Sequence, residues 1–161
     1  MSGIIFRSIA REDNPAIAGI IRSVLTEFGA NKPGTVFFDP ATDHLYQLFQ
    51  TPGSAYWVAQ SETLIAGGAG IFPTPGLPPG CCELVKLYLS KQFRRKGLGE
   101  QLIIQCFQTA QQYGYRQMYL ETMPELSQAM KLYEKLGFHY LPGPMGQSGH
   151  YGCDLWMLKN L

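Results

Sequence analysis

Residues 81–99 constrain the fold of this chain more than any other stretch. An apolar, strand-like run from Glu83 to Leu89 is followed by a short polar turn, a basic triplet at 94–96, and the glycines Gly97 and Gly99, where a helical pattern begins. Glycine lets the backbone bend with its N–H groups exposed, and a helix N-terminus attracts anions. The stretch predicts either a cradle for a phosphate or pyrophosphate, or an ordinary strand–turn–helix corner with solvated charges.

Two better-known phosphate loops do not fit this stretch. A P-loop requires Lys-Ser or Lys-Thr directly after its second glycine, and neither Gly97 nor Gly99 is followed by such a pair. A dinucleotide-binding fingerprint requires a third glycine three residues after the second, and that position is Leu102. The remaining pattern is Arg94-x-x-Gly97-x-Gly99.

Length and charge limit the classes of function. The 161 residues fit one domain, 1–161, with a sizeable core. A formal net charge of +1 gives no overall positive field, so nucleic acid is not expected as the main partner and any anion site must be local. We expect no signal peptide and no membrane association, because no apolar run approaches the length of a membrane span.

The four cysteines do not indicate a metal site. Cys81, Cys82, Cys106 and Cys153 show no Cys-x-x-Cys spacing and lie near no histidine pair. We therefore expect no metal, and free thiols in a reducing cytoplasm.

Hydrophobic periodicity and turn residues predict the order β-α-α-β-β-β-α-β-α-β-β, a mixed α+β sheet with helices on both faces. Asn14 is expected to cap the first helix, with Pro15 at its first position and Gly29 at its end. Asp39-Pro40 is expected to start the second helix, which ends near 51–53. One further helix is expected from Leu98 onward, with Tyr113-Gly114 at its end, and another over 125–136. The expected strands cover 4–9, 54–60, 64–72, 83–89, 118–122, 138–141 and 151–158.

The Gly/Pro-rich segment from Pro73 to Gly80 has the composition of a rigid exposed loop. A domain linker would have the same composition. Because neither side of the segment is long enough to form a complete domain, we expect a loop within one domain.

A second motif, Leu132-Tyr133-Glu134-Lys135-Leu136-Gly137-Phe138, follows the glycine loop at a suitable distance. With Arg94-x-x-Gly97-x-Gly99, the intervening strand and the element order, it resembles the GNAT superfamily of acyl-CoA-dependent N-acetyltransferases. The two motifs and the elements between them cover about half of the chain.

The resemblance implies an enzyme that uses acetyl-CoA as co-substrate. The central strand would splay from its neighbour, and the backbone of Leu87, Tyr88 and Leu89 would bind the pantetheine arm and the acetyl carbonyl. The pyrophosphate would be held by the loop of Arg94, Arg95, Lys96, Gly97, Leu98 and Gly99. A primary amine would attack the thioester directly through a tetrahedral intermediate, and Tyr133 would protonate the departing thiolate. A core aromatic is the alternative role of Tyr133.

A protonated amine also needs a base, and Glu83 lies where family members often have such a carboxylate. In an unbulged strand its side chain shares a face with that of Leu87. Glu121 is the competing base, and a solvated strand-end residue is the alternative for Glu83. We expect Lys86 on a solvated sheet face, although it could instead be a partner of either glutamate. His150 and Cys153 are interpreted as substrate wall or packing rather than an acetyl-cysteine relay.

Two positions depart from the family pattern. Leu126 stands where many members have an asparagine that hydrogen-bonds the cofactor arm, so that bond is missing or supplied by another group. Lys91 replaces a frequent proline after the central strand. Neither change removes the pyrophosphate loop.

The acceptor remains open at this point: a small-molecule amine, or an N-terminal or lysyl amine of a peptide. The loops from Gly29 to Phe38 and from Pro142 to Cys153 are the expected substrate walls. A non-catalytic acyl-CoA sensor and a transferase of longer acyl groups are the alternative functions. Homodimerisation is common in the family, but leaves no readable mark in this sequence.

Overall fold

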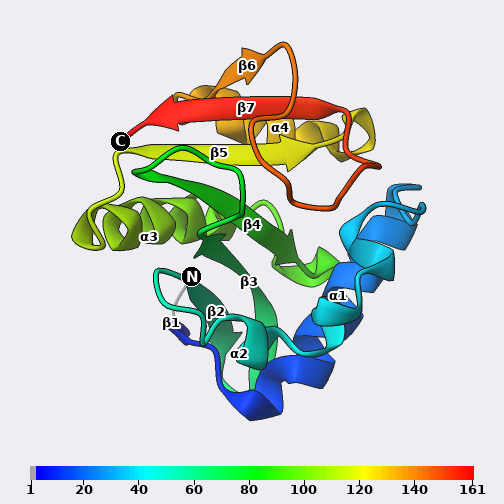
Figure 1. Cartoon of the computed structure of the whole chain (residues 1–161). Helices are drawn as coiled ribbons and strands as arrows, with labels where there is room; N and C mark the ends of the chain where they lie inside the picture. The colour runs from blue at the N-terminus through cyan, green and yellow to red at the C-terminus, as the bar shows by residue number, and fades with distance from the viewer. Residues whose placement is uncertain (1–2) are drawn as a thin grey trace.

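The strands of the described chain, residues 3–161 of a computed structural model, form one seven-stranded sheet in the order β1-β2-β3-β4-β5-β7-β6 (Figure 1). All neighbouring pairs are antiparallel except β4 and β5, which are parallel. The strands are β1 (Ile4–Ser8), β2 (Ala55–Ser61), β3 (Leu64–Phe72), β4 (Cys81–Leu89), β5 (Gln117–Thr122), β6 (His139–Leu141) and β7 (Leu155–Asn160).

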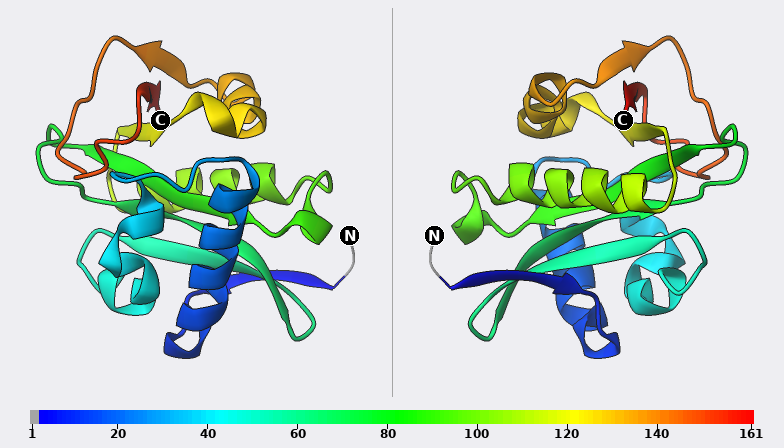
Figure 2. Two further views of the ribbon diagram at one scale, coloured as in Figure 1. Left: turned by 90° about the vertical axis from the view of Figure 1, so that its right-hand side faces the viewer. Right: turned by 90° about the vertical axis from the view of Figure 1, so that its left-hand side faces the viewer.

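Helices cover both faces of the sheet, as predicted: Figure 2 shows α1 on one face and α3 on the other. The helices are α1 (Asn14–Glu27), α2 (Leu45–Leu48), α3 (Leu98–Gln112) and α4 (Ser127–Lys135). Short 3-10 turns lie at Arg11–Asp13, Val36–Phe38, Pro40–Asp43, Lys91–Phe93 and Pro124–Leu126. The predicted fold class and element order are confirmed. No helix in residues 3–161 is both long enough and apolar enough to span a membrane.

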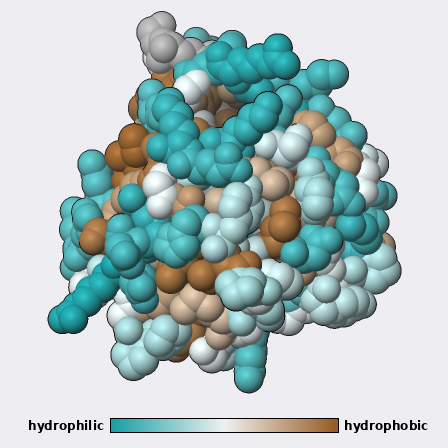
Figure 3. Space-filling model, turned by 90° about the horizontal axis from the view of Figure 1, so that it is seen from above, coloured by the Kyte–Doolittle hydropathy of each residue, from teal (hydrophilic) through white to brown (hydrophobic). Residues whose placement is uncertain are grey.

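The two larger hydrophobic cores follow from this layering. Apolar side chains of α3 and α4 pack against one face of the sheet, around Leu102, Ile103 and Met118. Those of α1 and α2 pack against the other face, around Ile21, Leu45 and Val58. Viewed from above the molecule of Figure 1, the hydrophobic residues left at the surface form small patches among hydrophilic ones (Figure 3).

The parallel pairing of β4 with β5 is short. It joins only Cys81 to Gln117, Cys82 to Met118, and Glu83 to Tyr119. Among residues 3–161, no strand pairs with the β5-facing edge of β4 beyond Glu83, and β5 continues beside β7. The predicted splay of the central strand is therefore present, and it leaves a gap in the sheet.

A bulge in β4 sits beside this gap. The β3–β4 register shifts between Gly68 and Gly70, and Lys86 takes the left-handed backbone conformation, with φ of 54°. Val85 then packs on the α1 side and Leu87 on the α3 side. Glu83 lies on the same face of β4 as Val85. The bulge therefore places Glu83 and Leu87 on opposite faces, whereas an unbulged strand would place them on the same one.

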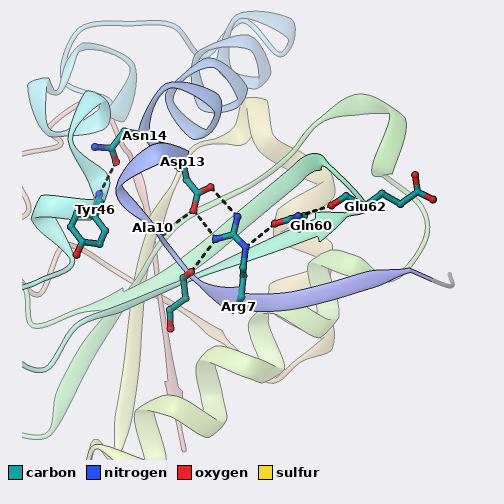
Figure 4. A network of polar contacts seen from close by, with 8 residues as sticks. Arg7, Ala10, Asp13, Asn14, Tyr46, Gln60 and Glu62 are labelled. Carbon is teal, nitrogen blue, oxygen red and sulfur yellow. Dashed lines mark hydrogen bonds and ion pairs between the residues drawn. The ribbon is translucent and has the colours of Figure 1, made fainter.

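The start of α1 differs from the prediction. Asn14 is the first helical residue rather than the cap, because its side chain bonds α2: its Oδ1 accepts from the backbone N–H of Tyr46 at 2.8 Å. The preceding residue, Asp13, binds the Arg7 guanidinium through both oxygens, at 2.7 and 2.9 Å, and accepts from the N–H of Ala10 (Figure 4). This network fixes the turn between β1 and α1.

Two further element predictions need correction. The segment expected to form the second helix instead forms the 3-10 turn Pro40–Asp43 and the short α2, because the backbone of His44, at φ −133° and ψ 44°, interrupts the helix between them. The last strand begins at Leu155 rather than Tyr151, since the backbone of Gly152 turns to donate to the carbonyl of Gly34 at 2.7 Å. The segment from Pro73 to Gly80 is a loop between β3 and β4, and it accepts a hydrogen bond at Pro75 from the N–H of Gln147.

Candidate active site

A cavity of about 380 Å³ opens where β4 and β5 diverge. Its lining comes from β4, the loop before α3, the end of β5, α4, and parts of α1 and of the segment 142–153. Most of the predicted site residues lie on it: Glu83, Leu87, Tyr88, Leu89, Arg94, Arg95, Gly97, Leu98, Gly99 and Tyr133. Glu121, Leu126, His150 and Cys153 line the same cavity, whereas Lys96 is exposed beside it.

The loop before α3 presents a run of free backbone donors. Within residues 3–161, no acceptor receives a hydrogen bond from the N–H groups of residues 95–100, whereas the N–H of Arg94 bonds the carbonyl of Lys91 at 3.3 Å. Left-handed backbone at Arg95 (φ 61°) and Gly97 (φ 79°) curves this segment into α3. Such a concave array at a helix N-terminus binds anions.

The Arg94 side chain points to α1 rather than into solution. Its Nη1 and Nη2 donate to the carboxylate of Glu27 at 2.8 and 2.9 Å, and its Nε donates to the carbonyl of Leu89 at 3.1 Å. The guanidinium carbon also lies 5.0 Å from the ring centroid of Phe28. The basic side chains next to the free N–H groups that stay exposed are those of Arg95 and Lys96.

The unpaired edge of β4 lies between this loop and the carboxylates. The side chains of Leu87 and Leu89 pack into the α3-side core, and that of Tyr88 packs on the α1 side. The Tyr56 hydroxyl donates to the carbonyl of Lys86 at 2.8 Å and so fixes the bulge. An extended ligand can therefore lie along the edge without unfolding any pairing.

Tyr133 projects from α4 and is 8% exposed. Its ring packs edge-on against Phe138, at 5.8 Å between centroids. Its hydroxyl forms no hydrogen bond with any described residue and keeps some exposed surface. Burial, together with nearby Cys153, raises the pKa of Tyr133, so the phenol is protonated at neutral pH and can donate a proton. Tyr88 has the same properties: burial raises its pKa, and its hydroxyl has no described partner.

Glu83 is 4% exposed and accepts a hydrogen bond from the Thr74 hydroxyl at 2.5 Å. Burial raises the pKa of Glu83 to about 7, with a smaller contribution from the negative charge of Glu121. Glu121 is engaged on both oxygens, since it accepts from the Tyr119 hydroxyl at 2.7 Å and from the Ser148 hydroxyl. Of the two candidate bases, Glu83 is the one whose carboxylate accepts a single hydrogen bond from the described residues, against two for Glu121.

Lys86 does not lie on a solvated sheet face, and this expectation was wrong. The bulge turns it inward, and it is 8% exposed. It forms no ion pair within 4.0 Å and no side-chain hydrogen bond among the described residues, so it is not a direct partner of Glu83 or Glu121. Sequence reasoning missed its burial because the bulge depends on β3.

Two further groups, His150 and Cys153, line the cavity from the segment 142–153. His150 Nε2 lies 2.8 Å from Asp39 Oδ2, which connects the segment 142–153 to the loop before α2. The residues are 111 positions apart, so no sequence signal joined them. Burial raises the pKa of the Cys153 thiol to about 12, and the thiol is therefore un-ionised at neutral pH. No group of three or more His, Cys, Asp or Glu side chains arranged to hold a metal occurs in residues 3–161.

The family model described as "Acetyltransferase (GNAT) family" matches residues 10–138. This chain belongs to the GNAT acetyltransferase family. An Escherichia coli protein named "Uncharacterized N-acetyltransferase YjgM" is 42% identical to it over 159 residues, which cover 98% of this chain and 95% of that protein. The membership confirms the resemblance seen in the two motifs and makes the chain an acyltransferase.

Solved GNAT structures share the whole fold at low sequence identity. A GNAT acetyltransferase from Staphylococcus aureus superposes with a TM-score of 0.86 at 19% identity, and the match covers 98% of this chain and 99% of that one. A GNAT phosphinothricin acetyltransferase from Sinorhizobium meliloti, solved in complex with acetyl-CoA, gives a TM-score of 0.75 at 20% identity. That match covers 99% of this chain and 89% of the other. The GNAT fold therefore extends over nearly all of this chain.

Proposed function

We propose that this GNAT enzyme transfers the acetyl group of acetyl-CoA to a primary amine by direct attack. One observation carries the proposal: a single cavity joins the free N–H groups of residues 95–100, the unpaired edge of β4, the buried carboxyl of Glu83 and the open hydroxyl of Tyr133. These are the parts that a thioester donor with a pyrophosphate at one end requires.

The donor fits the residues present. The free N–H groups of residues 95–100 would receive the pyrophosphate, with the charges of Arg95 and Lys96 beside it. The pantetheine arm would add to the open edge of β4 at Leu87–Leu89 as an extra strand. Leu126 lines the cavity with an apolar side chain and offers the arm no hydrogen bond, so the β4 backbone would supply polar contacts to the arm.

Glu83 has the environment of a general base. A primary amine is mostly protonated at pH 7 and must lose a proton before it attacks. With its pKa raised to about 7, Glu83 is partly ionised at that pH and can accept this proton directly or through water. A β4 backbone N–H at the open edge would bind the oxyanion of the tetrahedral intermediate, a kind of contact whose loss costs about 3 kcal/mol in other enzymes.

Tyr133 would complete the reaction by donating its proton to the thiolate that leaves. Its neutral phenol, open to the cavity and free of partners among the described residues, suits that role. A relay through Cys153 is disfavoured because the high pKa of this thiol leaves little thiolate to act as nucleophile.

Thermal unfolding with acetyl-CoA, CoA or ATP tests the donor site first. A ligand at a hundred times its dissociation constant adds about 2.7 kcal/mol of stability, so both CoA species should raise the melting temperature and ATP should not. Thiol release with acetyl-, butyryl- and octanoyl-CoA and a panel of amines then tests the reaction. CoA binding without thiol release from any donor and amine pair would overturn the proposed transfer.

A further inference from the structure

Lys86 is a buried cation without a described partner. It is 8% exposed and lines the cavity, yet its ammonium group makes no hydrogen bond or ion pair with any residue of 3–161. The ammonium also keeps some exposed surface, since no fully buried side-chain nitrogen or oxygen lacks a partner among the described residues. A buried charge of this kind is costly unless something pairs with it.

The carboxylates near Lys86 already have other partners. Asp39 is bonded to His150 at 2.8 Å and to the N–H of Ala41 at 2.9 Å. Glu83 accepts from Thr74. The charges of Asp39 and Glu83 favour the protonated form of Lys86, although burial lowers its pKa. The ammonium group is therefore the cation in this region that is left to bind a ligand.

The donor does not account for this cation. The free N–H groups for the pyrophosphate begin at residue 95, beyond the end of β4, whereas Lys86 lies at the bulge in the middle of the strand. Lys86 lines the cavity together with Glu83, and Glu83, as the proposed base, must lie next to the acceptor amine. An anion bound by Lys86 would thus be part of the acceptor.

We infer that the acceptor is a small amino acid-like molecule whose carboxylate binds the Lys86 ammonium while its amine lies at Glu83. This inference rests on the proposed function and narrows its acceptor. A singly charged carboxylate fits one cation among several acidic groups better than a phosphate does. The same acidic groups, Glu83 and Glu121, attract the ammonium end.

The short separation along the strand limits the size of the molecule. Glu83 and Lys86 are three residues apart on β4, and both line the cavity. The carboxylate and the amine must then be only a few bonds apart, as in α- or β-amino acids. A lysine side chain of a protein carries no carboxylate at that distance, and a peptide N-terminus carries one only where its first residue is aspartate, so aspartyl peptides are left out of the comparison.

Matched acceptors test the inference with the wild-type enzyme and acetyl-CoA. Thiol release is measured for each of the common amino acids, for its carboxamide, for the amine left after decarboxylation, and for a peptide that begins with the same residue. The best amino acid should exceed its carboxamide by about 100-fold in kcat/KM, because loss of the carboxylate leaves Lys86 buried and unpaired.

Variants of Lys86 test whether this residue causes the preference for the amino acid over its carboxamide. Lys86→Met should lower kcat/KM for the amino acid and change that of the carboxamide little, whereas Lys86→Arg should keep part of the preference. Lys131→Met, which removes an exposed lysine of α4, is the control and should behave as wild type. Melting temperature and CoA affinity show whether each variant is folded.

The outcomes separate this inference from the proposed function. Efficient transfer to carboxamides or peptides in the wild type, or an equal loss for all acceptors in Lys86→Met, would overturn the carboxylate contact and leave the transfer itself standing. Thiol release from no amine at all would overturn both.

Discussion

Arg94 and Glu27 form a two-pronged ion pair, at 2.8 and 2.9 Å, that fastens the loop before α3 to the end of α1. The basic residue of the Arg94-x-x-Gly97-x-Gly99 pattern thus bonds a carboxylate of its own chain. Its guanidinium orients the backbone that follows, and the N–H groups of residues 95–100 remain free for an anion.

A double-mutant cycle on this pair separates positioning from direct phosphate contact. Because each partner holds the loop through the other, Glu27→Gln and Arg94→Met should each weaken CoA binding several-fold, and the double variant should be no worse than either single one. CoA dissociation constants from calorimetry measure this. Tighter CoA binding by Glu27→Gln would instead mean that Arg94, once released, binds phosphate itself.

Removing the Tyr133 hydroxyl should slow the chemical step. Loss of a positioned general acid costs about 10² to 10⁴ in rate, so Tyr133→Phe should lower kcat to that extent and leave the dissociation constant of acetyl-CoA unchanged. Tyr88→Phe is the matched control, because Tyr88 also lines the cavity with a free hydroxyl. If Tyr133→Phe kept a normal kcat and Tyr88→Phe lost it, Tyr88 rather than Tyr133 would be the general acid.

Glu83 should set the pH dependence of the reaction. Since its pKa is raised to about 7, kcat/KM should rise with pH through that value as the carboxylate forms. Glu83→Gln should lose this rise together with at least about 10² of the rate, and Glu121→Gln should retain it. A pH profile of all three proteins decides, and a rise that disappears only in Glu121→Gln would make Glu121 the base.

The same raised pKa makes a prediction for stability. The pKa of a glutamate in an unfolded chain is about 4.3, so the folded protein holds this proton more tightly and loses stability as pH rises from 4.3 through 7. Between pH 4 and pH 8 the free energy of unfolding of the wild type should fall by about 3 kcal/mol relative to Glu83→Gln. Urea unfolding of both proteins across this range measures the difference.

Gly67 lets β3 approach the bulged part of β4. A Cβ at this position would lie 2.0 Å from the carbonyl oxygen of Tyr88, so Gly67→Ala should push β4 away, destabilise the fold by about 2 kcal/mol and weaken acetyl-CoA binding. Gly19→Ala, in an exposed and uncrowded part of α1, should instead stabilise by about 1 kcal/mol. Equal effects of the two changes in urea unfolding would contradict this account.

Local patterns predicted most of the fold. The strand, the glycines and the amphipathic helix around residues 81–112 are contiguous in the chain, so period and turn chemistry were sufficient to predict them. The α1 cap was mispredicted because Asn14 bonds α2 and Asp13 binds Arg7 across a turn. Tertiary contacts therefore determine where α1 begins, and a capping rule based on neighbouring residues takes no account of them.

In the candidate site, too, local patterns predicted some features and tertiary contacts determined the others. The residues of the two motifs line one cavity, yet the inward turn of Lys86 was not predicted. It depends on a register shift against the glycines of β3, and strand periodicity assumes that no such shift occurs. The contact of His150 with Asp39 joins two loops, and loops carry no periodic signal from which their folded partners could be predicted.

The two ends of the cavity are encoded differently along the chain. One unbroken segment, from the bulge of β4 to the first turn of α3, contains the backbone groups proposed for the donor. The proposed acceptor side combines Glu83 and Lys86 of β4 with separate loops, which meet at contacts such as that between Asp39 and His150. Changes in those loops can therefore give a descendant enzyme a new substrate without altering its donor site.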